Sequence, residues 1–259
     1  IYDDIILSYI INMKGKVALS MISPWMAKLI GSLPQGLVKC ISDKLLNGYL
    51  NKYAAIEVKG MEHLNGVKRP IIFICNHLSN SDALVLGNVL KKEKLIFVAG
   101  MKLNDDCLTK LGMSITKTIV IKPNSADKGA ISDIVKAVKS GENVLIFPEG
   151  TRSRTAAMNR GKKGIVLIQK LTRGRIVPIG ICGTEKLLPI NDKGMALESF
   201  HHAKVTVNIG KKLQIPNKRE GEEKHKYEDR VIDFLMCEIA KLLPEKYRGV
   251  YNFNEGGKN

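Results

Sequence analysis

Short apolar runs recur along the chain from about residue 53, and segments in which apolar residues follow helical spacing separate them. The runs predict strands at 55–58, 71–75, 95–99, 118–121, 144–147, 176–181 and 205–209. Helical spacing is clearest over 126–139, 161–171 and 223–243. Nearly continuous apolar strands that alternate with helices are typical of a sheet covered on both faces. We therefore predict an α/β fold with a single mixed, largely parallel sheet of about seven strands flanked by helices.

Residues 14–50 differ from the rest, because their apolar residues are interrupted by lysines and prolines. No window reaches the roughly 18–20 apolar residues of a membrane span, and Pro24 and Lys28 argue against a signal peptide. Two helices broken near Pro34 explain the segment better, either as a hairpin packed on the core or as a pair lying on a bilayer. The single tryptophan, Trp25, favours the bilayer. The predicted organisation is a helical membrane-docking segment at 1–52, an α/β domain at 53–250 and a polar tail at 251–259.

The net charge of +16 indicates anionic partners, namely nucleic acid, an anionic lipid surface, or an acidic ligand or carrier. Aromatic residues make up only 5% of the chain, and no base-stacking or recognition-helix pattern is present, which disfavours nucleic acid. The five cysteines include no C-x-x-C pair, and Cys75 and Cys182 lie inside apolar runs. This pattern favours reduced core thiols in a cytosolic setting.

A histidine stands where the predicted strand at 71–75 ends, and an aspartate stands in the first turn of the helical pattern that follows. A strand-loop-helix corner lets the chain fold His77 back over the helix N-terminus, where an ionised Asp82 is favoured. The carboxylate then holds one imidazole N–H and leaves the other nitrogen as a general base. Ser79 or Asn80 is the expected N-cap. The alternative interpretation is a cap or polar contact without catalysis.

A second polar turn, Phe147-Pro-Glu-Gly-Thr-Arg-Ser-Arg154, follows the predicted strand at 144–147. Gly150 permits a tight turn, and the hydroxyl, amide and guanidinium donors around Thr151 and Arg152 suit a phosphate. Glu149 would repel a phosphate, so we expect it to pair with an arginine or to accept from a substrate hydroxyl. The alternative is a solvated polar loop.

Two further positions accompany these turns. Lys122 places a cation at the end of the strand at 118–121, and Pro178 interrupts an apolar strand, which suggests an edge, a bulge or a kink toward the site. No metal is expected, because His201 and His202 are adjacent and would point to opposite faces of a strand. His63 and His225 have polar neighbours and are predicted to lie on the surface. The chain also lacks a phosphate-binding Gly-Lys-Ser/Thr loop and a Gly-x-Ser-x-Gly elbow.

These stretches, in this order, resemble the four motif blocks of the PlsC-like glycerolipid acyltransferases, the 1-acylglycerol-3-phosphate acyltransferases. The His-x4-Asp block is matched by His77 and Asp82 after Asn76, and Phe-Pro-Glu-Gly-Thr-Arg-Ser is matched in full by 147–153. Gly112 to Lys122 fits the second block loosely, with lysine where arginine is usual. Pro178 and its apolar neighbours match the fourth block. The resemblance spans roughly Glu57 to Gly210.

The resemblance implies acyl transfer from a thioester of acyl carrier protein or coenzyme A to the sn-2 hydroxyl of 1-acylglycerol-3-phosphate, with no further cofactor. His77 would act as the base and Asp82 would orient it, while the acceptor phosphate would lie at Glu149, Gly150, Thr151 and Arg152, with Lys122 as a weaker candidate. The enzyme would lie on the cytoplasmic face of the membrane. Another lysophospholipid or an aminoacyl lipid is an alternative acceptor. The distant alternative is a protein that binds anionic lipid or nucleic acid without catalysis.

Overall fold

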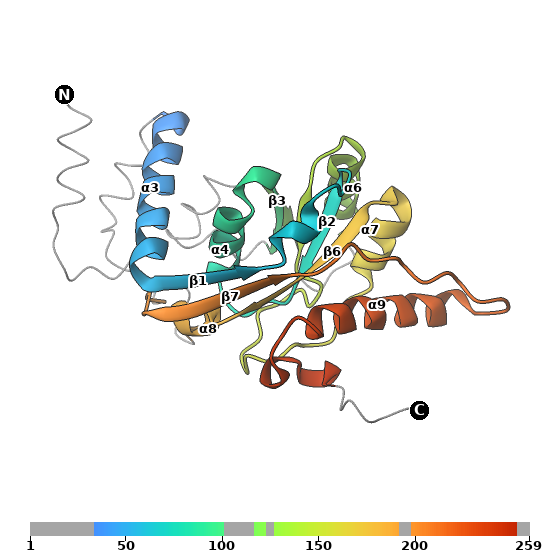
Figure 1. The fold of residues 1–259 in the computed structure, drawn as a ribbon. Coiled ribbons are helices and arrows are strands. Elements are labelled where there is room, and N and C mark those ends of the chain that lie inside the picture. Colours follow the sequence, from blue (N-terminus) through green and yellow to red (C-terminus); the bar gives the residue numbers. More distant parts are fainter. Residues whose placement is uncertain (1–33, 101–116, 123–126, 192–197, 253–259) are drawn as a thin grey trace, which may run out of the picture.

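A sheet of seven strands, ordered β1-β7-β6-β2-β5-β3-β4, forms the centre of the molecule (Figure 1). The computed structural model describes residues 34–100, 117–122, 127–191 and 198–252. Every strand pair is parallel except β6 with β7. The strands are β1 Ala54–Lys59, β2 Ile71–Cys75, β3 Ile96–Gly100, β4 Lys117–Ile121, β5 Val144–Ile146, β6 Arg175–Cys182 and β7 Ala203–Ile209. The predicted mixed, largely parallel sheet is therefore confirmed.

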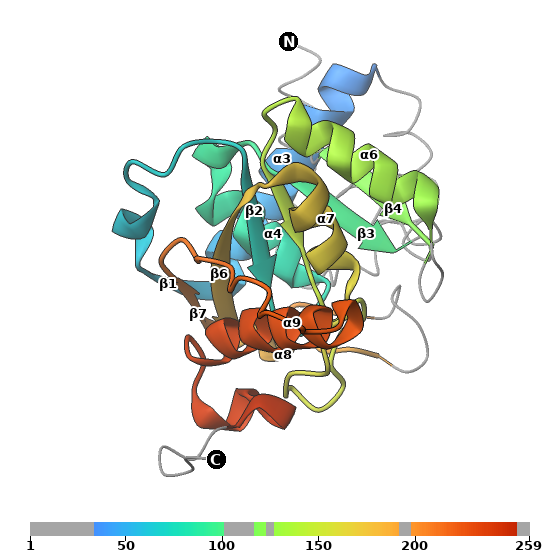
Figure 2. The ribbon, with the colours of Figure 1, turned by 90° about the vertical axis from the view of Figure 1, so that its right-hand side faces the viewer.

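Helices cover both faces of this sheet (Figures 1 and 2). The described helices are α3 Gln35–Tyr53, α4 Ser81–Val89, α6 Lys128–Lys139, α7 Gly164–Thr172, α8 Thr184–Leu187 and α9 Lys224–Ala240. Helices α6, α7 and α9 pack on one face and α3, α4 and α8 on the other, and each side has its own hydrophobic cluster. Strand β2 shows why both layers are needed, because Ile72 and Ile74 enter one cluster while Ile71 and Phe73 enter the other. Side chains alternate along a strand, so an entirely apolar strand must be buried on both faces.

The antiparallel pairing of β6 with β7 determines which segments lie near the end of β2. Because β6 runs parallel to β2 and β7 runs antiparallel to β6, the chain enters β7 at the same edge of the sheet where β2 ends. Strand β1 is parallel to β7, so the end of α3 and the start of β1 lie at this edge too. The carboxyl ends of β2 and β5 and the segment before β7 therefore share one rim.

Pro178 lies in an interior strand, because β6 is flanked by β7 and β2. The expectation of an edge strand is therefore wrong. Pro178 pairs in register with Ile74, and the ladder to β7 begins one residue later, at Ile179. A missing N–H is tolerated there because the ladder to β7 has not yet begun.

Helix α3 begins at Gln35, directly after Pro34, where the sequence predicts a break. Its buried residues Leu46 and Leu50 face the body of the domain, and Leu50 belongs to the cluster that covers Phe73. Residues 1–33, including Trp25, lie outside the described residues, so membrane docking of 14–50 stays a prediction. No helix in the described ranges combines the length and apolar character needed to cross a bilayer.

Tyr251, the first residue of the predicted polar tail, packs against the domain. Tyr251 is 6% exposed, and its hydroxyl accepts a hydrogen bond of 3.0 Å from the Gly161 N–H. An aromatic side chain with a partnered hydroxyl contributes to the core in this position. Residues 253–259 lie outside the described residues.

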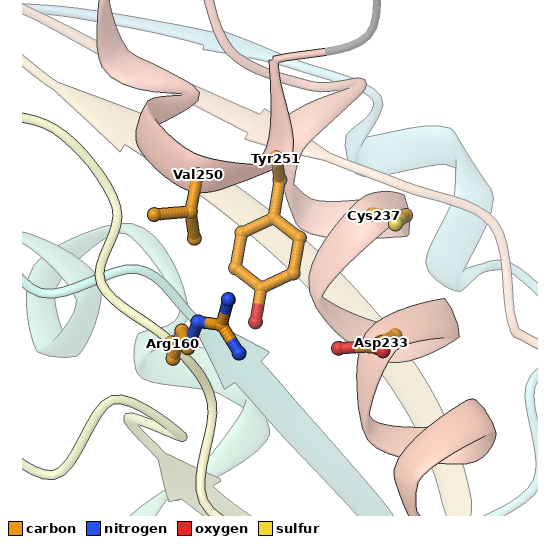
Figure 3. Close-up of a pocket in the computed structure, with 5 residues that line it drawn as sticks. All are labelled: Arg160, Asp233, Cys237, Val250 and Tyr251. Atoms are coloured by element: carbon orange, nitrogen blue, oxygen red, sulfur yellow. The ribbon is translucent and has the colours of Figure 1, made fainter.

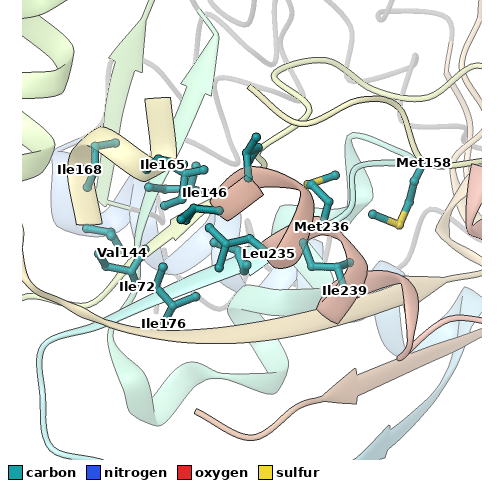
Figure 4. Packing of buried hydrophobic residues seen from close by; sticks show 14 of the residues in the cluster. Ile72, Val144, Ile146, Met158, Ile165, Ile168, Ile176, Leu235, Met236 and Ile239 are labelled. Atoms are coloured by element: carbon teal, nitrogen blue, oxygen red, sulfur yellow. The ribbon is translucent and has the colours of Figure 1, made fainter. Parts of the chain in front are cut away.

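Helix α9 covers the centre of the sheet, which gives a test of the fold (Figure 4). Leu235 is fully buried in the cluster that contains Ile72, so Leu235→Ala should lower the free energy of unfolding by about 2–5 kcal/mol. Urea unfolding followed by circular dichroism measures this loss. The exposed residue Lys226 on the same helix provides the control, since Lys226→Ala should change stability by no more than about 0.5 kcal/mol. Equal effects of the two substitutions would contradict the packing described here.

Candidate active site

His77 lies two residues after the end of β2, and Asp82 lies in the first turn of α4. The His77 Nδ1 is 2.8 Å from the Asp82 Oδ2. The same carboxylate oxygen accepts hydrogen bonds from the main-chain N–H groups of Leu78, at 2.7 Å, and Ser79, at 3.0 Å. Because an ionised carboxylate only accepts hydrogen bonds, Nδ1 carries the proton and Nε2 is left as a proton acceptor. The pair therefore has the geometry of a general base with its orienting carboxylate.

The imidazole of His77 is held on its face as well as at its edge. Phe147, which follows β5, stacks on the ring with centroids 4.0 Å apart and an interplanar angle of 15°. The His77 side chain keeps 20% of its surface exposed, whereas Asp82 is fully buried. A ring fixed by a carboxylate and an aromatic face presents Nε2 in one direction, which a reacting hydroxyl requires.

Asn76 joins the end of β2 to β6. Its amide Nδ2 donates to the Ile181 carbonyl at 2.8 Å, and its Oδ1 accepts from the Ile181 N–H at 2.8 Å. The fully buried side chain thus replaces a main-chain pair just beyond the ladder between the two strands. This contact fixes the point at which the loop carrying His77 leaves the sheet.

Ser79 and Asn80, the two predicted N-cap candidates of α4, differ in the contacts that their side chains make. Asn80 occupies the N-cap position of α4, but its side chain makes no capping bond there and instead donates to Glu198 Oε2 at 2.8 Å. The Ser79 hydroxyl accepts from the Ser81 N–H at 3.1 Å and donates to the Leu188 carbonyl at 2.7 Å. Asn80 thus holds the N-cap position without a capping side-chain bond, while Ser79 binds two N–H groups of the first turn, that of Ser81 with its hydroxyl and that of Asp82 with its carbonyl, at 3.2 Å.

The loop after β5 is bonded to the main chain of His77 on both sides. The Ser153 N–H donates to the His77 carbonyl at 2.8 Å, and the His77 N–H donates to Glu149 Oε1 at 3.0 Å. The other Glu149 oxygen accepts from the Asn159 N–H at 2.8 Å. Two segments more than seventy positions apart in sequence are therefore held in direct contact.

The contacts of Glu149 differ from those predicted for it, which were to an arginine or to a substrate hydroxyl. It is 1% exposed and contacts two main-chain amides, neither an arginine nor open solvent. Burial raises the pKa of its carboxyl, while the hydrogen bonds from Asn159 and His77 lower it in part. A solvated loop is also wrong for this residue and for Ser153, which is 3% exposed. Glu149 holds the main chain at His77 and Asn159, and it is not placed to hold a phosphate.

Arg152 does reach the rim, and it is paired. Its Nη1 donates to Glu198 Oε1 at 2.7 Å, with side-chain exposures of 19% for Arg152 and 0% for Glu198. Thr151 is exposed beside it. Gly150 has a φ of +68°, and a Cβ there would lie 2.9 Å from the Lys162 Nζ. Two basic side chains, Lys162 and Arg152, therefore lie at the turn, and Arg152 has a buried carboxylate partner that the sequence did not reveal.

Lys122 lies away from His77 and Arg152 in the sheet. It follows β4, which is the third strand from β2 in the sheet order, or roughly 14 Å away at ordinary strand spacing. Its main-chain N–H donates to Asp127 Oδ2 at 2.9 Å. Gly112 and the rest of 101–116 lie outside the described residues, so the assignment of the second motif block stays a prediction.

Cys75 lies next to Asn76, but its thiol is not a reacting group. Burial raises the pKa of its thiol well above the usual range, and the nearby charge of Asp82 raises it further. The thiol therefore stays protonated near neutral pH and is not a nucleophile. Within the described ranges, no group of three or more histidine, cysteine and acidic side chains could hold a metal ion.

Two hollows on the described surface lie away from His77. One, of about 250 Å³, is lined by Arg160, Asp233, Cys237, Val250 and Tyr251 (Figure 3). The other, of about 560 Å³, lies where α3 meets β1 and includes Tyr53, His202 and Lys204. Neither contains His77 or Arg152, so the reacting groups are identified by their contacts and not by an enclosed cavity.

The chain is similar in sequence to known acyltransferases. The acyltransferase family matches residues 55–182. A chloroplastic 1-acyl-sn-glycerol-3-phosphate acyltransferase of Arabidopsis thaliana is 28% identical over 162 residues, or 61% of this chain and 43% of that one. A probable 1-acyl-sn-glycerol-3-phosphate acyltransferase of Mycoplasma genitalium is 27% identical over 150 residues, covering 54% of this chain and 56% of its own. This chain spans about half the length of the curated relatives it matches.

A solved structure shares the fold. The crystal structure of the 1-acyl-sn-glycerophosphate acyltransferase PlsC from Thermotoga maritima aligns with a TM-score of 0.55 at 19% sequence identity. The alignment covers 93% of this chain and 88% of that one.

The raised pKa of Glu149 gives a test of the buried contact to His77. The folded protein binds the carboxyl proton more tightly than the unfolded chain, so this group's contribution to stability falls as pH rises from 4.5 through the raised value. We expect the stability of Glu149→Gln relative to wild type to improve across that range in urea unfolding. Glu222 is the control, because Arg230 holds its pKa at about 2, and Glu222→Gln should show no such trend above pH 4.5. Parallel pH profiles for wild type and Glu149→Gln would contradict the assignment.

Proposed function

This chain belongs to the acyltransferase family, and from that premise we propose that it acylates the sn-2 hydroxyl of 1-acylglycerol-3-phosphate to form phosphatidic acid. The observation that carries the proposal is the contact between the His77 loop and the Arg152 loop. This contact brings His77, the proposed base, and the loop that carries Arg152 to one rim of the sheet, which supports the proposal. The donor is a thioester of acyl carrier protein or of coenzyme A.

The proposed reaction is a direct transfer. The acceptor hydroxyl gives its proton to Nε2 of His77 while its oxygen attacks the thioester carbonyl carbon, and the C–S bond then breaks. The imidazolium returns the proton to the leaving thiolate, so an ester and a free thiol are formed without an acyl-enzyme. Asp82 stabilises the imidazolium and keeps Nδ1 protonated. The residues around His77 supply this chemistry without a metal or another cofactor.

The acceptor phosphate is proposed to bind at Arg152 and Thr151. A guanidinium has five N–H donors in a planar fork, and Glu198 accepts from Nη1, which leaves donors for a phosphate. A held phosphate orients the rest of the acceptor, so the free hydroxyl is brought toward His77. Glu149 is not part of this phosphate site.

The protein is proposed to work at the cytoplasmic face of a membrane, because its acceptor and product are lipids. The net charge of +16 supports attraction to an anionic surface. The predicted helices of residues 14–50 would supply the apolar contact.

Replacing the base separates an enzyme from a lipid-binding protein. We expect His77→Ala to lower kcat by about 10²–10⁴-fold with either thioester donor, because the hydroxyl loses its proton acceptor. Binding to vesicles that contain anionic lipid should be unchanged. The exposed His225 is the matched control, and His225→Ala should keep full activity. Undiminished acyl transfer by His77→Ala would refute the assignment, and a panel of lyso-acceptors identifies the preferred one.

Replacing Arg152 tests the phosphate site. Arg152→Ala should raise the KM for 1-acylglycerol-3-phosphate roughly ten- to hundredfold, the usual worth of hydrogen bonds to a charged group. The KM for the thioester should stay the same. Arg152→Lys keeps the charge but loses the fork, so its acceptor KM should lie between those of wild type and the alanine variant. An unchanged acceptor KM in both variants would show that the phosphate binds elsewhere.

A further inference from the structure

Glu198 is a buried carboxylate that lies outside residues 55–182, which the acyltransferase family matches. Its two oxygens bind different loops of the site. Oε1 accepts from Arg152 Nη1 at 2.7 Å, and Oε2 accepts from Asn80 Nδ2 at 2.8 Å. Arg152 belongs to the loop after β5, and Asn80 belongs to the loop between His77 and Asp82. A single side chain therefore bridges the proposed phosphate site and the proposed base.

The segment that carries Glu198 is anchored on its C-terminal side by two contacts. The His201 N–H donates to the Leu187 carbonyl at 2.8 Å. Phe200 is 8% exposed and stacks on Tyr49 of α3 with ring centroids 5.4 Å apart. The chain then enters β7 at the rim where β2 ends. These contacts fix the backbone that carries the Glu198 carboxylate.

The burial of this charge requires both of its partners. Removing a carboxylate from water is strongly unfavourable unless it is paired and its oxygens accept hydrogen bonds. Arg152 provides the opposite charge and Asn80 satisfies the second oxygen. In return, an arginine that would otherwise sample many rotamers is held in one direction before any ligand binds.

We propose that Glu198 is a positioning residue that orients Arg152 toward the phosphate of the acceptor and fixes its distance from His77. This inference rests on the proposed function. A carboxylate close to a phosphate would by itself weaken binding through repulsion. Glu198 therefore improves acceptor binding only if the orientation of Arg152 outweighs that repulsion, and the two effects move the acceptor KM in opposite directions.

Two substitutions of Glu198 test the proposal in the full-length protein. Glu198→Ala should raise the KM for 1-acylglycerol-3-phosphate about tenfold, because Arg152 loses its anchor, and the KM for the thioester should not change. Glu198→Gln keeps a side chain of the same shape, and its amide oxygen still accepts from Arg152 if Asn80 turns its own amide. It should recover most of the loss. A fall in the acceptor KM in either variant would show that repulsion dominates and would overturn the proposal.

A double substitution separates positioning from general structural support. If Glu198 acts through Arg152, Glu198→Ala should cause no further rise in acceptor KM in an Arg152→Ala background, where only the repulsion of the phosphate is left to be removed. Additive losses, or equal losses for acceptor and donor, would overturn the proposal. Glu222 is the matched control, since it also pairs with an arginine, Arg230, at 2.7 Å but outside the site, and Glu222→Ala should leave both KM values unchanged. Thermal unfolding confirms that the variants compared are folded.

Calorimetry with glycerol 3-phosphate distinguishes failure of this inference from failure of the proposed function. Acyl transfer by wild type together with wild-type kinetics in both Glu198 variants overturns the role of Glu198 alone. Without acyl transfer, the proposed function fails, and the binding measurement decides the inference. About tenfold weaker binding of glycerol 3-phosphate by Glu198→Ala than by wild type and Glu198→Gln then supports it. Equal binding by all three proteins, or no binding by wild type, overturns it.

Discussion

The site depends on two main-chain hydrogen bonds that hold His77 to the loop after β5. Its carbonyl accepts from Ser153, and its N–H donates to the Glu149 carboxylate. Both contacts are made by the backbone of His77, so a rotamer change of its imidazole does not release them. With the backbone of His77 held by one loop and its ring by Asp82 and Phe147, the base has little freedom left. The position of Arg152 follows, since it lies next to Ser153 in the same loop.

Three buried carboxylates are placed around this contact, and each is stabilised in a different way. Asp82 is held by amides of its own loop and by the imidazole, and Glu149 by amides of two segments. Glu198 depends on a guanidinium and a side-chain amide. Their burial is unfavourable in isolation, so each one makes the loops it joins depend on one another. In the part of the chain that the structure describes, the buried acidic side chains thus lie at this site, although the net charge of the protein is +16.

The sequence predicted local features well and long-range contacts poorly. Strand β2 and the corner that carries His77 and Asp82 follow from nearby residues, because apolar runs and helix starts are local signals. Asn76 binds Ile181, 105 positions away, and no local pattern indicates such a partner. The residues around Glu149 predict a contact to an arginine or a substrate hydroxyl, and the family resemblance implies a phosphate, whereas the fold buries the side chain against main-chain amides. Glu198 carried no motif, and its only signal was its place shortly before a predicted strand.

The antiparallel placement of β7 explains how a residue without a motif reaches the site. If β7 ran parallel to β6, its first residues would lie at the opposite edge of the sheet, far from the end of β2. The reversal brings Glu198 to Arg152 and, two residues later, brings Phe200 against Tyr49 and Tyr53 of α3. The end of α3 and the guanidinium of Arg152 therefore rest on the same short segment. The direction of one strand thus determines both the packing of α3 and the surroundings of the proposed phosphate site.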